Sequence, residues 1–178
     1  MKVFLSLPMN GKSDEWIMDN IARMIANYNA VSKEDNDYIH TFRNQYDFEF
    51  SGDKKAIRLW YLGEAIKKLG RCNIILFHPE WYKARGCRVE DYVATKYDID
   101  SYSFAESQGF LDAIIETVVR PKPSVKANIR RIVDDLGIWT PELFVKTPIE
   151  DFENLKGVGS VTIHYIEELK NKLKDKEN

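Results

Sequence analysis

The strongest constraint on the fold of this chain is a continuous apolar run near its middle, residues 73–77, which reads Asn-Ile-Ile-Leu-Phe. A strand with so few polar positions is typical of a parallel sheet that helices cover on both faces. Residues 3–7, Val-Phe-Leu-Ser-Leu, form a second such run, which ends at a loop containing proline and glycine. We therefore predict an α/β fold with an open, mostly parallel sheet.

The other patterns in residues 1–120 alternate between helical and extended segments. We expect Ser13 to cap the first helix, because two acidic residues follow it at the positive helix end. Apolar spacing predicts further helices at 54–71, 89–97 and 110–119, and further strands at 38–42 and 102–104. Because ligands of such sheets bind beyond the carboxyl ends of the strands, the loops at 8–13 and 78–87 are the candidate ligand loops.

Two prolines at 121 and 123 divide the chain, since neither allows a preceding helix to continue. Only helical patterns follow: a helix from Ser124 that ends at Gly137, short helices from Thr140 and Pro148, a tight turn at 155–159 and a final helix at 160–173. We therefore expect an α/β domain at residues 1–120 and a small all-α domain at 121–178.

Charge and composition exclude several classes of protein. The chain has 26 Lys and Arg against 28 Asp and Glu, and residues 121–178 carry 10 of each sign, so neither part is a strongly basic nucleic-acid binder. No run approaches the roughly 18 apolar residues that cross a bilayer, and two cysteines are too few for a disulfide scaffold. We interpret the chain as a reduced, cytoplasmic protein that does not enter a membrane.

The first loop, residues 6–13, nearly spells a phosphate-binding P-loop. Ser6 stands where that motif needs glycine, and Phe77-His78 lacks the aspartate expected to hold magnesium, so we do not predict an NTPase. A loop between a strand and a helix N-terminus still favours anions. An ordinary strand-to-helix turn is the alternative.

The second candidate loop leads into a helix that carries Glu90. We expect Glu90 in the first turn, where the helix dipole favours the ionised carboxylate that a nucleophile requires, although a capping role fits as well. Gly86 offers backbone freedom beside a ligand, and Cys87 is more typical of a packed residue than of a nucleophile.

Aromatic and basic residues in this loop allow two interpretations each. Trp81 and Tyr82 suit either stacking on a flat ligand ring or packing in the core. Arg85 and Arg88 suit either a phosphate or pairing with acidic side chains. The three His have no metal-ligand spacing, so we predict no metal site and expect no cofactor.

Three segments together resemble the nucleoside 2-deoxyribosyltransferase superfamily, most closely a branch found in bacteria and phages. They are Phe4 through Ser13, Trp60 through Phe77, and the loop and helix that read Trp-Tyr-Lys-Ala-Arg-Gly-Cys-Arg-Val-Glu at 81–90. The resemblance covers roughly residues 1–100.

The resemblance implies a flavodoxin-like or Rossmann-like fold and cleavage of the N-glycosidic bond of nucleosides or nucleotides. Glu90 matches the nucleophile, which forms a glycosyl-enzyme intermediate that water or another base resolves with retention. The implied ligand-binding residues are Ser6, Pro8, Met9, Asn10, Gly11, Trp81, Arg85, Gly86 and Cys87. Superfamily members commonly pair so that subunits complete each other's sites, which implies a homodimer.

The chain departs from the superfamily pattern where protons are handled. Active members carry an aspartate near the position of Ala65, an aspartate at Asn73, and aspartate or serine at Ala84. Either Glu64 or Asp53 replaces the missing acid, or the protein binds a nucleotide without turnover.

The second part resembles a helix-hairpin-helix module, similar to the C-terminal domain of the bacterial RNA polymerase α subunit. The matching segments are residues 136–143 and 155–162. In that family a glycine-containing hairpin presents backbone N–H groups to DNA phosphates, which implies nucleic-acid binding by Lys156, Gly157 and Gly159. Because this part has no net charge, docking of a protein or oligomerisation remains the alternative.

Overall fold

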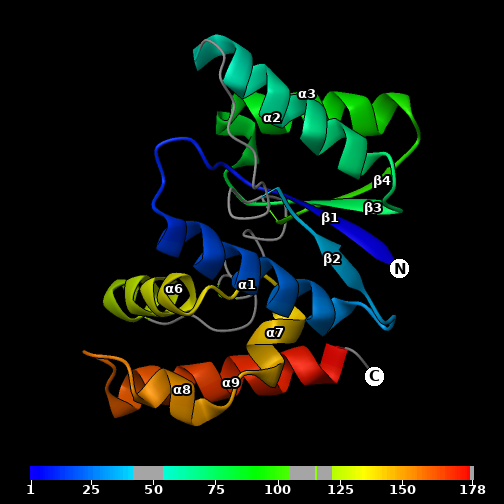
Figure 1. Ribbon diagram of the computed structural model, residues 1–178. Helices are drawn as coiled ribbons and strands as arrows, with labels where there is room; N and C mark the ends of the chain where they lie inside the picture. Colours follow the sequence, from blue (N-terminus) through cyan, green and yellow to red (C-terminus); the bar gives the residue numbers. More distant parts are fainter. Residues whose placement is uncertain (42–53, 105–114, 116–121, 177–178) are drawn as a thin grey trace. The chain divides into compact units, whose positions relative to one another are not determined.

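The computed structural model describes residues 1–41, 54–104, 115 and 122–176. The chain separates into two compact units (Figure 1). The first consists of Met1–Ile25 and Lys33–Ala105, and the second of Ala26–Ser32 and Glu106–Asn178. The boundary that we predict near residue 121 lies in a stretch of which only Ile115 is described, so it stays a prediction.

A parallel sheet forms the centre of the first unit, which confirms the α/β prediction. Within the described residues it has four strands in the order β2-β1-β3-β4. Their bounds are Lys2–Ser6 for β1, Asp37–Ile39 for β2, Ile74–Phe77 for β3 and Asp100–Ser103 for β4. Ser6 lies beside Phe77, and Phe77 beside Ser103, so three strands end level at their carboxyl edge.

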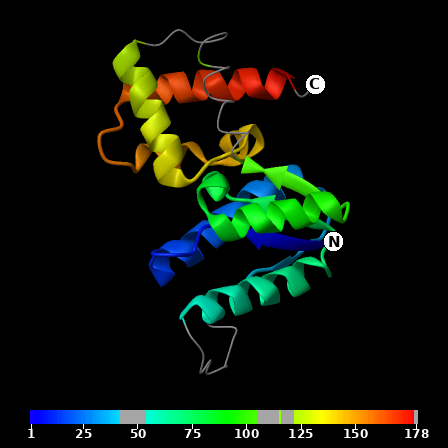
Figure 2. The same ribbon diagram turned by 90° about the horizontal axis from the view of Figure 1, so that it is seen from above.

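Helices cover both faces of this sheet. α2 (Lys54–Leu69) and α3 (Arg85–Lys96) lie side by side over one face, and the first part of α1 (Asp14–Val31) covers the other (Figures 1 and 2). Phe4, Ile75 and Phe77 of the sheet pack with Ala65 and Leu69 of α2 and Ala94 of α3. The continuous apolar pattern of β1 and β3 therefore arises because helices cover both faces of the sheet, as the sequence predicts.

Local signals explain where the helices of this unit begin. The backbone N–H of Trp16 donates to Ser13 Oγ at 3.2 Å, so the predicted cap of α1 is confirmed. α3 begins at Arg85 instead of residue 89, because a short 3₁₀ turn, η2 (Trp81–Lys83), and extended backbone at Ala84 reverse the chain early. The segment expected as a helix at 110–119 and the loop at 43–53 lie outside the described residues, apart from Ile115.

The second unit is helical where it is described. Its elements are α6 (Pro123–Leu136), α7 (Pro141–Lys146), α8 (Ile149–Glu153), α9 (Ser160–Lys176) and the last turns of α1. Gly137 ends α6 with φ 64°, as predicted. The prediction that Ser124 caps this helix is wrong, since Pro123 already occupies its first position and Lys122 precedes it.

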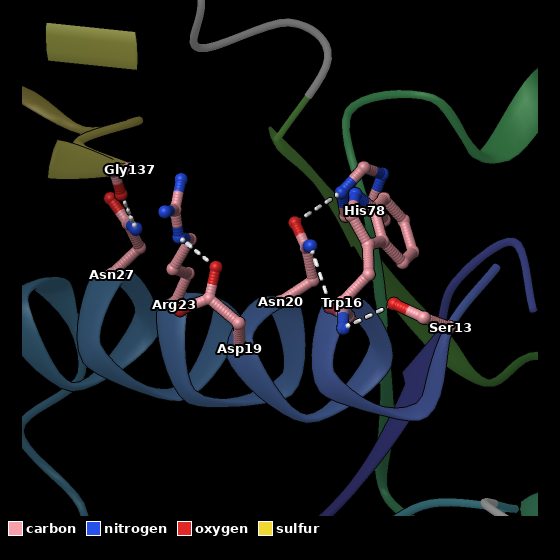
Figure 3. Close-up of polar contacts among 8 residues, drawn as sticks. All are labelled: Ser13, Trp16, Asp19, Asn20, Arg23, Asn27, His78 and Gly137. Carbon is pink, nitrogen blue, oxygen red and sulfur yellow. Dashed lines mark hydrogen bonds and ion pairs between the residues drawn. The ribbon is translucent and has the colours of Figure 1, made fainter. Parts of the chain in front are cut away.

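Asn27 joins two helix ends inside the second unit. Its Nδ2 donates to the carbonyl of Gly137 at 2.8 Å (Figure 3), and its Oδ1 accepts from the backbone N–H of Trp139 at 2.6 Å. The amide therefore satisfies the backbone between α6 and α7, where helix ends leave carbonyl and N–H groups unpaired.

We predict opposite effects of alanine at two glycines of the first unit. Gly11 has φ 77° in the turn closed by the Lys12 N–H donating to Met9 O at 3.2 Å, so Gly11→Ala strains the backbone and lowers the free energy of unfolding by about 1 kcal/mol. Gly63 lies inside α2 with open space around an added methyl group, so Gly63→Ala raises it by about 0.5–1 kcal/mol. Urea unfolding measures both, and a shift in the same direction for the two variants contradicts this description.

Candidate functional site

The carboxyl edge of the sheet carries a buried hydrogen-bonded pair. Ser6, the last residue of β1, donates from Oγ to Oε2 of Glu90 at 2.5 Å, across 84 residues of sequence. Ser6 is 1% exposed and Glu90 is 7% exposed. α3 follows β3 after the short turn η2, β3 pairs with β1, and the buried face of α3 therefore meets the end of β1 through Glu90.

Cys87 completes this cluster one helical turn before Glu90. Its thiol is buried and also hydrogen-bonds with Ser6. Burial raises the pKa of the Cys87 thiol to about 12, and the neighbouring Glu90 carboxyl adds to the effect. The thiol therefore stays protonated at neutral pH, which agrees with a packed residue and not with a nucleophile. Three candidate site residues thus lie together: Ser6, Cys87 and Glu90.

The electrostatics of Glu90 differ from the prediction. Glu90 is the sixth residue of α3, in its second turn, so the helix N-terminus does not hold its carboxylate as the sequence suggested. Burial raises the pKa of Glu90, and the hydrogen bond from Ser6 opposes this shift. The surroundings of Glu90 therefore favour the protonated acid more than water does.

A neutral histidine lies at the same edge, and sequence reasoning missed its role. His78 follows β3 and is 4% exposed. Its Nδ1 accepts the backbone N–H of Glu80 at 3.0 Å, so Nε2 carries the proton and donates to Asn20 Oδ1 at 2.9 Å (Figure 3). Burial lowers the pKa of His78 to about 4, although Glu80 opposes the shift. No sequence pattern predicts the His78–Asn20 hydrogen bond, because the two residues are 58 positions apart.

The contacts of His78 connect the two candidate ligand loops. The Trp16 ring lies against the imidazole, with 5.4 Å between ring centroids, and Lys12 Nζ lies 4.4 Å from the centre of the Trp16 ring. Asn20 also donates to the carbonyl of Trp16 at 2.8 Å (Figure 3). The start of α1 and the start of the second loop are therefore held to each other through His78.

The other candidate ligand residues occupy the two loops and the start of α3. Pro8 and Met9 are half-buried, whereas Asn10, Gly11, Arg85 and Gly86 are exposed. Trp81 packs on Phe77 with 4.6 Å between centroids, and its Nε1–H donates to Ser103 Oγ at 3.2 Å. Gly86 lies inside α3 with open space around it, so the helix does not use the backbone freedom of a glycine there.

The candidate proton donors are not part of this buried cluster as described. Glu64 projects from α2 and pairs with Lys67, one turn later on the same helix, at 2.6 Å. Asp53 lies outside the described residues. Among the described residues, therefore, no contact brings another acid to the cluster in place of those that the superfamily carries at Asn73 and Ala84.

The candidate nucleic-acid residues lie on an exposed turn before α9. Gly157 has φ 80°, and the carbonyls of Lys156 and Gly157 accept from Arg131 at 3.0 Å and from Asn128 at 3.3 Å. A hollow of about 340 Å³ lies beside the turn, and Gly159, Ser160, Glu153 and Glu167 are among its lining residues. The two acidic side chains oppose a phosphate at this place.

Within the described ranges, no group of three or more His, Cys, Asp or Glu side chains is arranged to hold a metal ion. No helix in the same residues has the length and apolar character needed to span a membrane.

Comparisons with protein-family models, with curated proteins and with solved structures gave no match to this chain.

We predict that removing the charge of Glu90 stabilises the protein as the pH rises. A raised pKa in the folded state makes ionisation costly, so the wild type loses stability above the ordinary glutamate value of 4.5, up to its folded pKa. Glu90→Gln escapes this loss and should unfold at higher urea than wild type at pH 8, with little difference at pH 4.

The matched control is Glu80→Gln at an exposed carboxylate. The hydrogen bond from Lys83 lowers the pKa of Glu80, so its contribution is present at pH 8 and is lost as the pH falls. This variant should be slightly less stable than wild type at pH 8. Equal pH profiles for the two variants would show that Glu90 is not held as described.

Proposed function

We propose that the first unit cleaves the N-glycosidic bond of nucleosides or nucleotides, with Glu90 as the nucleophile. The observation that carries this proposal is the Ser6–Glu90 hydrogen bond at the carboxyl edge of a parallel sheet, where such folds bind ligands. The two residues belong to separate sequence segments that resemble the nucleoside 2-deoxyribosyltransferase superfamily. Their meeting is what that resemblance requires, and it supports the assignment.

The reaction has two displacements at one carbon. A Glu90 carboxylate oxygen attacks the anomeric carbon while the bond to the base nitrogen breaks, and the base leaves with the electron pair and takes up a proton. Water, or the nitrogen of a second base, then attacks the same carbon, loses a proton to solvent and releases the carboxylate. Two inversions give net retention.

Ser6 is the positioning residue in this scheme. Its hydroxyl fixes one carboxylate oxygen and counteracts the effect of burial on the pKa of Glu90. Because only the ionised carboxylate attacks, activity should rise with pH through a pKa above the ordinary glutamate value. A missing general acid costs about 10²–10⁴ in rate, which predicts a slow enzyme unless Glu64 or Asp53 donates the proton.

A second candidate is a non-catalytic nucleotide-binding domain joined to a helical DNA- or protein-binding module. Burial favours the neutral form of Glu90, and Glu64 is engaged with Lys67, so both candidate catalytic carboxyls are in states that do not favour turnover. In this candidate, the exposed turn with Lys156, Gly157 and Gly159 is the surface through which the helical module binds its partner. Under either candidate we propose a cytoplasmic homodimer.

We predict that wild-type protein releases free base from at least one member of a nucleoside and nucleotide panel. Glu90→Gln should reduce release to background, and Ser6→Ala should slow it about tenfold, since a hydrogen bond contributes about 1.4 kcal/mol. Asp100→Asn is the control, because this exposed carboxyl lies at the start of β4, the end of the strand away from the carboxyl edge, and its loss leaves the rate unchanged. If wild type and Glu90→Gln release base at the same rate, the enzyme assignment is wrong.

Titration calorimetry separates the two candidates. The non-catalytic candidate predicts saturable nucleotide binding with no base in the quenched mixture after prolonged incubation. Base release that Glu90→Gln abolishes would rule it out.

A further inference from the structure

The near-neutral charge of the whole chain conceals a strongly basic stretch. Residues 54–96, which form α2, β3 and α3, contain 10 Lys and Arg against 4 Asp and Glu, whereas the other residues contain 16 and 24. This segment therefore has a formal charge of +6 in a chain of −2. Dividing the sequence at residue 121 does not reveal this, because acidic residues elsewhere in the first part cancel it.

Few of these cations are neutralised by the acids of the same stretch. Glu90 is buried, while Glu64 and Glu80 pair with Lys67 and Lys83. The fourth acid, Asp91, is half-buried on α3. Among the described side chains of this stretch, the exposed cations that enter no ion pair include Arg58, Arg85, Arg88 and Lys96.

The outer face of α3 collects three of these four cations. Arg85, Arg88, Tyr92 and Lys96 are all exposed and follow helical spacing of three or four residues. The buried residues Cys87, Glu90 and Ala94 occupy the opposite face. From Arg88 to Tyr92 and on to Lys96, each four-residue step rises about 6 Å along the helix.

Exposed aromatic rings lie among the cations. Tyr92 is 63% exposed with Lys96 Nζ 5.7 Å from its ring centre, and Tyr82, in η2 just before α3, is 54% exposed with Lys83 Nζ at 5.7 Å. α2, which contains the exposed Arg58, packs beside α3 (Figures 1 and 2). Large exposed rings gain little from folding, so the position of Tyr92 beside Arg88 and Lys96 in the helical spacing, with Tyr82 just before the helix, favours a ligand with flat rings and phosphates.

We propose that the basic-aromatic face of α3, defined by Tyr82, Arg85, Arg88, Tyr92 and Lys96, binds single-stranded nucleic acid. The cations attract the phosphates, and the tyrosine rings stack on unpaired bases, which a duplex keeps inside its own stack. A second copy of this cationic face would be repelled. This proposal does not depend on the glycosidase assignment.

The test is fluorescence anisotropy of a labelled 20-residue oligothymidine with full-length protein over a series of salt concentrations. Tyr92→Ala should weaken binding about tenfold, since stacking on one ring is lost. Arg88→Ala and Lys96→Ala should each weaken binding and reduce the slope of log K against log salt by about 0.7, the value for one phosphate contact on a single strand.

Matched variants locate the site. Tyr97→Ala removes a ring that is 76% exposed but lies beyond the end of α3, and Lys33→Ala removes an exposed cation of the first unit outside the basic stretch. Both should bind as wild type does. Lys156→Ala removes the cation of the exposed turn before α9 and should also have no effect.

Several results would overturn the proposal. The first is no binding at low salt. The second is an equal loss of affinity for Tyr92→Ala and Tyr97→Ala, or for Lys96→Ala and Lys33→Ala, and the third is a loss of affinity with Lys156→Ala alone. The fourth is tighter binding to duplex DNA or to anionic vesicles than to the single strand. Glu90→Gln should bind the oligonucleotide normally, so failure of the glycosidase assignment is distinguishable from failure of this one.

Discussion

The hydrogen bond from Ser6 to Glu90 is the interaction on which the candidate site depends. It forms because β1 and β3 are parallel neighbours that end level, and because α3 begins soon after β3 and turns Glu90 back over the end of β1. An exposed glutamate on the same helix would be one more surface charge. Because this carboxyl is enclosed between a strand end and a helix, its proton affinity is altered and its orientation is fixed. Both properties are typical of carboxyl groups in active sites.

Burial pushes two groups at this edge toward their neutral forms. It raises the pKa of Glu90 and lowers the pKa of His78 to about 4. The Ser6 hydroxyl opposes the first shift, and the two hydrogen bonds of His78 fix its neutral tautomer. The exposed cations Arg85, Arg88 and Lys96 lie on the opposite side of α3 from Glu90.

Much of the fold could be predicted from the sequence, because continuous apolar runs indicate buried parallel strands. The helix end at Gly137 and the helix cap at Ser13 could be predicted as well, because each depends only on neighbouring residues. The meeting of Ser6 with Glu90 was expected only through the resemblance of their two segments. The early start of α3 was missed because no side chain caps it. The partners of His78 and Asn27 were missed because contacts across 58 and 110 residues leave no periodic signal. The basic face of α3 was hidden by charge sums taken over whole domains, which do not record which side of a helix a residue occupies.

The central claim is that Glu90 is a buried carboxyl whose proton affinity is set by burial and opposed by Ser6. NMR titration of the side-chain carboxyl carbons in the wild type and in Ser6→Ala measures the pKa of Glu90 directly. The Glu90 resonance is identified as the one that is absent from the spectrum of Glu90→Gln. The claim predicts a Glu90 pKa above the ordinary 4.5 in the wild type and a further rise in Ser6→Ala. A Glu90 resonance that titrates at the ordinary value, unchanged by loss of the Ser6 hydroxyl, would contradict it.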